Sequence, residues 1–384
     1  RTKRSGRESA KLYVSSGSTE GPKDPSTPAR GRWGDSNRIA PGSAPVLRDE
    51  LAAVVALHRY PPERLRKSYV CALILTVALS CGTEPKRAGG DDPSLLERER
   101  QQQAALQASP ASSKPRPIYL TRAGLRKPKS ALYDAEADLY LVSNVNGLEQ
   151  TEDNNGFISK VDINGRLIKL RWIEGAAAGV KLSAPKGMAI VDGLLYVVDV
   201  GSVRVFDRES GKPQRTIQVK GAAFLNDIAA GPGGVLYLSD TGFERVAAGF
   251  RPSGTDAVYR IEETRVTSFY KTAALGFPTG LLADALGVWV ANRSGALMRI
   301  TPGGHKDTEY RLPKGLLDGM VKSNDGRLLV SSWDGRCIYA VQNDGGSVEL
   351  ADGMTSPADI GYDSKRNRLL IPLFHRDQFV IYPL

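Results

Sequence analysis

The sequence predicts an all-β protein, a six-bladed β-propeller whose ring is closed by an N-terminal strand. Three observations predict it: a strand–turn–strand pattern that occurs six times, a spacing near 40 residues between most copies, and heavy turn punctuation from 40 Gly and 23 Pro among 384 residues. Such a repeat is typical of a propeller blade, because no blade buries both of its faces alone. A β-sandwich, or two stacked sheets, is the alternative that Gly-rich alternating strands also fit.

The six copies align at the position that follows a Pro or Leu turn. Successive aligned residues are 57, 40, 53, 39 and 40 positions apart, so the short spacings define the unit. In chain order these residues are Lys129, Lys186, Asn226, Thr279, Asp318 and Ala358. The two long spacings contain insertions, 147–156 and 241–255, which we expect to flank one mouth of the channel. The last copy, 356–384, is one strand short, and we expect 115–122 to supply that strand and leave no open edge.

The formal net charge of +10 would ordinarily favour nucleic acid or an anionic membrane as a partner. The first 80 residues, however, hold 14 basic and 7 acidic side chains. The remaining 38 basic and 35 acidic residues give the rest of the chain a net charge of only +3. We therefore expect no nucleic-acid partner. Three Cys and three His exclude a disulfide framework and disfavour a structural zinc site.

The segment 61–81, a basic run followed by an apolar stretch, has the features of a secretory signal. The basic run Arg64–Lys67 precedes twelve uncharged residues, which are too few to span a bilayer comfortably. The residues before Cys81 resemble a bacterial lipobox, with Ala78 where Leu is usual, and this implies cleavage before Cys81 and lipidation of that cysteine. An ordinary buried apolar segment is the alternative interpretation.

The segments on either side of this signal are not expected to fold. Residues 1–60 are rich in Arg, Ser, Gly and Pro without apolar periodicity, and no Met precedes Met188, so we interpret them as disordered sequence translated upstream of the true start. Residues 82–114 are polar and Gln-rich, which indicates a flexible tether. The domain at 115–384 is then expected to be an extracytoplasmic monomer that contacts a membrane only through its lipid anchor. Because Gly82 follows the cysteine, the lipobox resemblance implies the periplasmic face of the outer membrane in a Gram-negative cell.

The aligned residues predict a site at the central channel. The innermost strand of each propeller blade begins at the channel, so residues at one repeat position form a ring at one mouth. Asp227 and Asp359 follow two of the aligned residues and should lie one step deeper. Carboxylate and amide oxygens that converge from several blades are the ligands that a hard cation such as Ca²⁺ needs.

Residues 115–384 resemble the senescence-marker-protein/gluconolactonase propellers, the regucalcin-like family. Three motifs carry the resemblance: Leu225-Asn226-Asp227, Phe277-Pro278-Thr279-Gly280-Leu281 and Leu317-Asp318-Gly319-Met320. The resemblance implies a divalent cation, most simply Ca²⁺, bound by Asp318, Asn226 and the residue at position 279. It also implies that Asp318 serves as general base and that Asn226 and Asp227 face the substrate.

Two positions depart from the family pattern. The family has a metal-binding Asn where this chain has Thr279, and a metal-binding Glu where this chain has Lys129. An ammonium about 5 Å from a divalent ion costs several kcal/mol even at an effective dielectric constant of about 20. A metal would bind only if Lys129 turned outward, or if Asp227 and Asp359 replaced the missing ligands.

Two functions follow from the resemblance and its departures. The first is metal-assisted hydrolysis of a small, sugar-type lactone, in which the cation polarises the carbonyl group and Asp318 activates a water molecule. The second is a propeller without catalysis that binds a small ligand or a partner protein at the same mouth, which Lys129 and Thr279 favour. Lys186 either binds a substrate carboxylate or neutralises neighbouring acidic groups.

Overall fold

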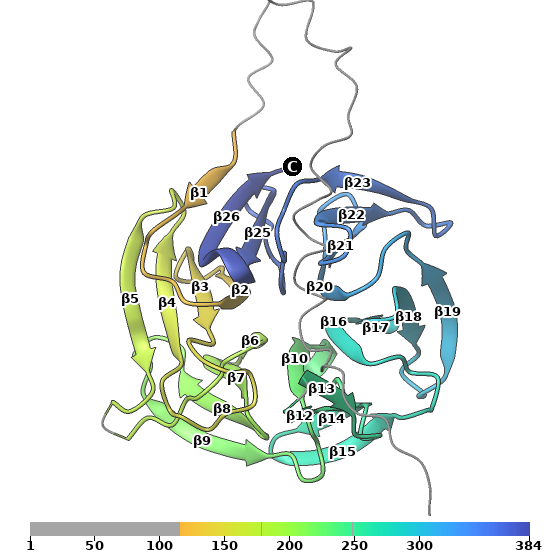
Figure 1. Cartoon of the computed structure of the whole chain (residues 1–384), viewed down its shortest axis with the longest axis horizontal. Helices are drawn as coiled ribbons and strands as arrows, with labels where there is room; N and C mark the ends of the chain where they lie inside the picture. The colour runs from red at the N-terminus through yellow and green to blue at the C-terminus, as the bar shows by residue number, and fades with distance from the viewer. Residues whose placement is uncertain (1–115, 178, 248) are drawn as a thin grey trace, which may run out of the picture. The chain divides into compact units, whose positions relative to one another are not determined.

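The computed structural model describes residues 116–384 apart from 178 and 248, and these residues form a six-bladed β-propeller. Six four-stranded antiparallel sheets stand around a central channel (Figure 1). The predicted fold class is therefore confirmed. The predictions for 1–60, 61–81 with Cys81, and 82–114 lie outside the described residues. Nothing helical in the described part of the chain is long and apolar enough to cross a membrane.

Each blade has its first strand innermost and its last strand at the rim (Figure 1). Blades one and two comprise β2 (Pro128–Asp134), β3 (Leu139–Asn144), β4 (Phe157–Asp162), β5 (Leu167–Glu174), β6 (Met188–Val191), β7 (Leu194–Asp199), β8 (Ser202–Asp207) and β9 (Pro213–Gln218). Blades three and four comprise β10 (Leu225–Ala230), β11 (Leu236–Asp240), β14 (Ala257–Glu262), β15 (Arg265–Tyr270), β16 (Pro278–Asp284), β17 (Gly287–Asn292), β18 (Ala296–Ile300) and β19 (Lys306–Arg311). Blades five and six comprise β20 (Leu317–Lys322), β21 (Leu328–Ser332), β22 (Cys337–Val341), β23 (Ser347–Ala351), β24 (Gly361–Asp363), β25 (Arg368–Leu373), β26 (Gln378–Pro383) and β1 (Ile118–Leu120).

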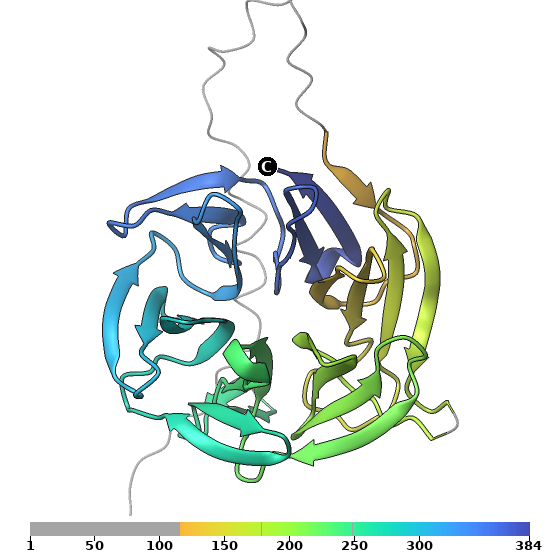
Figure 2. The ribbon, with the colours of Figure 1, turned by 180° about the vertical axis from the view of Figure 1, so that it is seen from behind.

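The ring is closed by β1, as the short last repeat predicts. This strand pairs antiparallel with β26 and places Ile118 opposite Ile381 and Leu120 opposite Phe379. The N-terminal strand thus completes the blade that contains the C-terminus, which Figure 2 shows from behind. The closure removes the unpaired edge that β26 would otherwise present to solvent.

The apolar core lies between the blades. Six of the apolar clusters in the described residues each join two neighbouring blades; Val198 of blade two packs in one cluster with Leu238 of blade three, and Val142 of blade one packs in another with Phe379 of blade six. Full burial of each such side chain contributes roughly 1.5–3 kcal/mol. No blade could bury these faces alone, which is why the repeat folds only as a ring.

The innermost strands are bulged at the aligned repeat position. In four blades the register between the first and second strands shifts at this point, across Lys129, Asn226, Thr279 and Asp318. A bulge leaves the extra residue out of the hydrogen-bond ladder and redirects its side chain. The bulges therefore turn the aligned residues toward the channel.

Adjacent innermost strands approach each other closely behind these bulges. A Cβ atom at Gly280 would collide with the backbone oxygen of Asp318, and one at Gly319 would collide with the backbone of Asp359. A serine of the second strand bridges the gap: Ser331 Oγ accepts from the amide of Gly319 at 2.9 Å and donates to the carbonyl of Ala358 at 2.8 Å. These contacts hold the backbones of neighbouring innermost strands close together at the mouth of the channel.

Candidate functional site

A cavity of about 400 Å³ opens at the mouth where the innermost strands begin. Four of the six aligned residues line it: Lys129, Asn226, Thr279 and Asp318. They come from four blades and are all at least nine-tenths buried. The fold therefore brings together residues that are up to 189 positions apart in the sequence.

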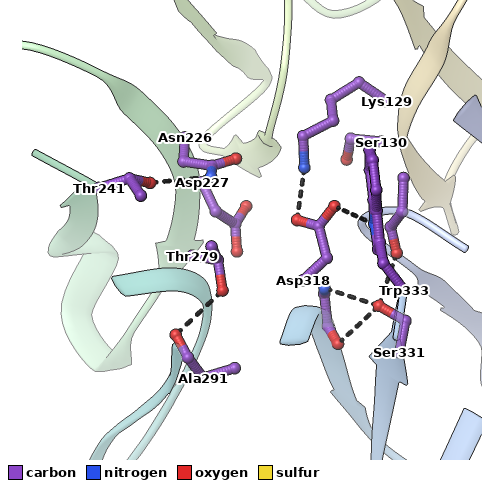
Figure 3. A network of polar contacts seen from close by, with 12 residues as sticks. Lys129, Ser130, Asn226, Asp227, Thr241, Thr279, Ala291, Asp318, Ser331 and Trp333 are labelled. Atoms are coloured by element: carbon purple, nitrogen blue, oxygen red, sulfur yellow. Dashed lines mark hydrogen bonds and ion pairs between the residues drawn. The ribbon is translucent and has the colours of Figure 1, made fainter. Parts of the chain in front are cut away.

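A buried ion pair lies at the base of this cavity. Lys129 Nζ donates to Asp318 Oδ1 at 2.5 Å, and the two side chains are only 7% and 8% exposed. Trp333 Nε1 donates to the other carboxylate oxygen at 3.0 Å. Figure 3 shows the lysine extending inward from blade one and the carboxylate held between the ammonium and the indole. Both oxygens of Asp318 thus have a donor from the protein.

The other two cavity residues are held by hydrogen bonds to their neighbours. Thr279 Oγ1 lies 2.7 Å from the carbonyl of Leu317 and 3.1 Å from that of Ala291, so its single proton serves backbone acceptors. Asn226 Nδ2 donates to Thr241 Oγ1 at 3.0 Å. Its Oδ1 is buried without a hydrogen-bond partner among the described residues.

Asp227 and Asp359 lie deeper, and they line a different cavity. This second cavity, about 380 Å³, is formed by the innermost strands of the blades. Asp227 accepts from the amides of Ile228 and Leu281, both at 2.7 Å. Burial, followed by the charge of Asp359, raises the pKa of Asp227 well above its usual value. Burial likewise raises the pKa of Asp359 to about 6, against the opposing effect of the Lys129 charge.

Lys186 and Ala358 are aligned in the repeat but do not line the first cavity. Lys186 is 1% exposed, its Nζ donates to the carbonyl of Ala184 at 3.2 Å, and it lies 5.3 Å from the ring centre of Phe224. Burial lowers the pKa of Lys186 to about 8. Ala358 packs with Phe374 in a small apolar cluster at the mouth. Neither side chain is placed where it would touch a ligand in the cavity.

Aromatic side chains that the repeat alignment did not single out form much of the cavity wall. They are Phe224, Phe243, Phe250, Trp333, Phe374 and His375. Trp333 and Phe374 pack with ring centres 5.5 Å apart, and His375 packs edge-on against both. The sequence contained a signal for Trp333, because this residue directly follows the second strand of its blade, and the second strands of other repeats end in Asp or Asn. Phe224 lies in the loop before β10, Phe243 and Phe250 lie in an inserted hairpin, and Phe374 and His375 lie in a short 3-10 helix. The repeat alignment carries no information about these residues.

The two insertions meet at this mouth. The insertion of blade three contains the hairpin β12 (Phe243–Val246) and β13 (Gly249–Pro252), and Glu149 of the blade-one insertion also lines the cavity. Gln150 Nε2 donates to the carbonyls of Ala223 at 2.8 Å and Phe243 at 2.7 Å. The blade-one insertion is thereby tied to the hairpin that carries Phe243.

The residues at the mouth do not fit a divalent cation. The ammonium of Lys129 takes the place that a cation would need beside Asp318 Oδ1, and Thr279 directs its proton to backbone carbonyls. Lys129 does not turn outward, and Asp227 and Asp359 belong to the second cavity. Among the described residues, no group of three or more His, Cys, Asp or Glu is placed to hold a metal ion. The ammonium is instead the positive charge that compensates the buried carboxylate.

Solved structures share this fold at low sequence identity. A virginiamycin B lyase from Staphylococcus aureus matches with a TM-score of 0.50 and 14% identity over 70% of this chain and 99% of its own. A gluconolactonase from Xanthomonas campestris matches with a TM-score of 0.50 and 17% identity over 69% of this chain and 89% of its own. A putative gluconolactonase matches with a TM-score of 0.50 and 14% identity over 69% of this chain and 92% of its own. A scan of protein-family profiles and a search of curated proteins give no match.

These likenesses establish the propeller. Gluconolactonase propellers are among the structures whose fold the chain shares, which is consistent with the resemblance found in its motifs. At 14% and 17% identity these matches support the fold alone, and the chemistry has to be argued from the residues of the site.

Proposed function

We propose that the protein is a hydrolase of small cyclic esters, with its site in the cavity that Lys129 and Asp318 line. The observation that carries the proposal is the buried ion pair: an ammonium and a carboxylate lie side by side at the base of a ligand-sized cavity. Ester hydrolysis needs a base for water and a positive group for the oxyanion, and this pair supplies both. The fold shared with gluconolactonases supports the proposal.

The reaction balances with these two residues alone. The carboxylate of Asp318 takes a proton from water as the water oxygen bonds to the ester carbonyl carbon, and the carbonyl electron pair moves onto its oxygen. The ammonium of Lys129 donates a hydrogen bond to that oxyanion. Collapse of the intermediate breaks the ring C–O bond, and the leaving alkoxide takes the proton from Asp318. The product is a hydroxy acid, and no step passes through a metal ion.

The test is hydrolysis of a panel of cyclic esters, followed as acid release at constant pH, before and after dialysis against a chelator. We expect activity that the chelator leaves unchanged, and a loss of at least about 100-fold in kcat for Asp318→Asn, the range for removal of a general base. Lys129→Met should lose activity as well, whereas the matched change Lys306→Met, in an exposed ion pair with Glu309, should not. No activity toward any panel member would overturn the hydrolase proposal. Activity that returns only with added Ca²⁺ would overturn the metal-free mechanism.

A second candidate function is ligand binding without catalysis. It is favoured by the two protein donors on Asp318, from Lys129 and Trp333, which compete with a water molecule for the carboxylate oxygens. In that case ring compounds would bind, and neither wild type nor the Asp318→Asn variant would turn them over. The Asp318→Asn variant would then change affinity alone.

We further propose that the propeller acts outside the cytoplasm as a lipid-anchored monomer. The support is the signal-like segment that ends at Cys81, in the part of the chain that the structure does not describe. Labelled fatty acid supplied to cells expressing the chain should enter the wild type and not the Cys81→Ser variant. A labelled Cys81→Ser variant, or an unlabelled wild type, would contradict the proposal.

A further inference from the structure

One oxygen at the base of the cavity is fixed as an unmet hydrogen-bond acceptor. Thr241 Oγ1 donates its only proton to the carbonyl of Pro278 at 2.7 Å, so toward Asn226 it can only accept. This requirement places the Nδ2 of Asn226 against Thr241 and leaves its Oδ1 on the opposite side (Figure 3). A buried acceptor without a partner has lost its hydration without compensation, and a donor on a ligand would restore the missing hydrogen bond.

The walls above this acceptor are aromatic on two facing sides. Phe224, Phe243 and Phe250 come from blade three and its hairpin, with Phe250 packing edge-on against Phe224 at 5.8 Å between ring centres. Trp333 and Phe374 come from blades five and six. In a ring of six, blade three lies opposite blade six, as Figure 1 shows for β12–β13 and β25–β26. A flat ring in the cavity would have aromatic side chains of blade three on one side and of blades five and six on the other.

Four polar side chains of the cavity are already paired, so a ligand with many hydroxyls would depend for partners on Glu149, Arg293 and His375, which also line it. The hydroxyl protons of Thr241 and Thr279 go to backbone carbonyls, and Lys129 and Asp318 bond each other. A sugar-type lactone carries several hydroxyl groups, each of which loses its water on entry and needs a partner. The cavity has one unmet acceptor at its base, Asn226 Oδ1, among the described atoms that line it.

We infer that the cavity takes a flat aromatic ring compound with one hydrogen-bond donor, its ring between the two aromatic walls and its donor on Asn226 Oδ1. The inference deepens the proposed function, since an aromatic cyclic ester replaces the sugar-type lactone that the motifs imply. Binding does not depend on turnover.

Three ring compounds separate the contributions of ring and donor. Coumarin is a flat aromatic cyclic ester without a donor, umbelliferone is the same ring with one hydroxyl, and D-gluconolactone is a polyhydroxylated lactone without an aromatic ring. Titration calorimetry in mildly acidic buffer, where the phenol keeps its proton, should give umbelliferone the highest affinity. Coumarin should bind about tenfold more weakly, the value of one hydrogen bond to a buried acceptor, and gluconolactone weakest.

Two variants assign this preference to the named residues. Asn226→Leu should bind coumarin as the wild type does and lose the tenfold preference for umbelliferone. Phe243→Ala should weaken both compounds together. Leu286→Ala, at an exposed turn residue outside the cavity, is the control and should change neither. Thermal melts of each variant show whether it remains folded, and wild-type selectivity among the three compounds is informative without any variant.

The outcomes separate this inference from the proposed function. The inference is overturned if gluconolactone binds as tightly as umbelliferone, or if folded Asn226→Leu keeps the umbelliferone preference. If the aromatic compounds bind in the expected order and no cyclic ester is hydrolysed, the inference stands and the hydrolase proposal fails. If gluconolactone alone is bound and hydrolysed, the inference fails and the hydrolase proposal stands.

Discussion

The two cavities along the channel use buried carboxylates in opposite ways. In the first, Asp318 is paired with the ammonium of Lys129 and faces a space walled by aromatic rings. In the second, Asp227 is held by two backbone amides and lies near Asp359, and the pKa values of both are raised by burial. The first cavity brings two compensating charges to a ligand. The second cavity places two acidic groups of like charge near each other.

Two adjacent residues of one innermost strand, Asn226 and Asp227, account for this difference. A bulge turns Asn226 toward the first cavity, and the next residue, Asp227, then points toward the second. Lys129 belongs to the first cavity, yet its charge also lowers the pKa of Asp227 and of Asp359. One lysine is thus the common counter-charge for three buried carboxyl groups. The comparison predicts large effects where that compensation is removed and smaller ones elsewhere.

The largest effect is expected from Asp318→Leu. This change leaves the ammonium of Lys129 buried without its partner, and breaking one side of a buried pair costs about 3–5 kcal/mol of unfolding free energy. The double variant Lys129→Met/Asp318→Leu should recover part of that loss, because it removes the unpaired ammonium but also the charge that lowers the pKa of Asp227 and of Asp359. Urea denaturation measures both. A single variant that loses under about 1 kcal/mol would show that the pair is unimportant for stability.

An opposite effect is expected in the second cavity from Asp359→Asn. Because the pKa of Asp359 rises from 3.8 to about 6 on folding, the native state binds more protons than the unfolded state between these values. The contribution of Asp359 to stability is therefore greatest below pH 3.8 and falls as pH rises through about 6. The variant should be more stable than wild type by about 3 kcal/mol at neutral pH, with a flatter pH profile. Unfolding free energies across this range measure it, with the exposed Asp344→Asn as control; an unchanged profile would contradict the prediction.

A smaller gain is expected from Lys186→Met. Burial lowers the pKa of Lys186 from 10.5 to about 8, so the unfolded state binds the extra proton between these values and wild-type stability rises with pH there. The variant removes this penalty and also the bond to the carbonyl of Ala184, so we expect a net gain of about 1 kcal/mol at neutral pH. The gain should vanish above pH 10.5. A loss of stability at neutral pH would mean that the buried ammonium is compensated.

The sequence predicted the ring and its closure because both follow from repetition. Six hairpins in one register determine the blades, and a last repeat one strand short leaves only the N-terminal strand to complete it. The aligned position also identified four residues of one cavity. These features depend on periodicity, which a single sequence displays.

The direction of individual side chains could not be predicted in the same way. The repeat gives Lys129 and Lys186 the same position, yet the first points to Asp318 and the second is buried against Ala184 and Phe224. The bulge at Lys129 and the packing around Lys186 decide this, and neither leaves a local pattern. The aromatic wall was missed for a related reason, since loops such as the hairpin with Phe243 vary independently of the repeat.

The smallest effect on stability, and a local one, is expected from Gln150→Glu. The glutamate has nearly the same shape but cannot donate to the carbonyls of Ala223 and Phe243, so the two insertions lose their link at the first cavity. Global unfolding should change little, because the core between the blades is untouched. Trypsin should cleave the hairpin after Arg245 about tenfold faster, since two hydrogen bonds no longer resist local opening. The exposed Gln214→Glu serves as control, and equal cleavage rates for wild type and Gln150→Glu would show that the hairpin holds its place over the cavity without this link.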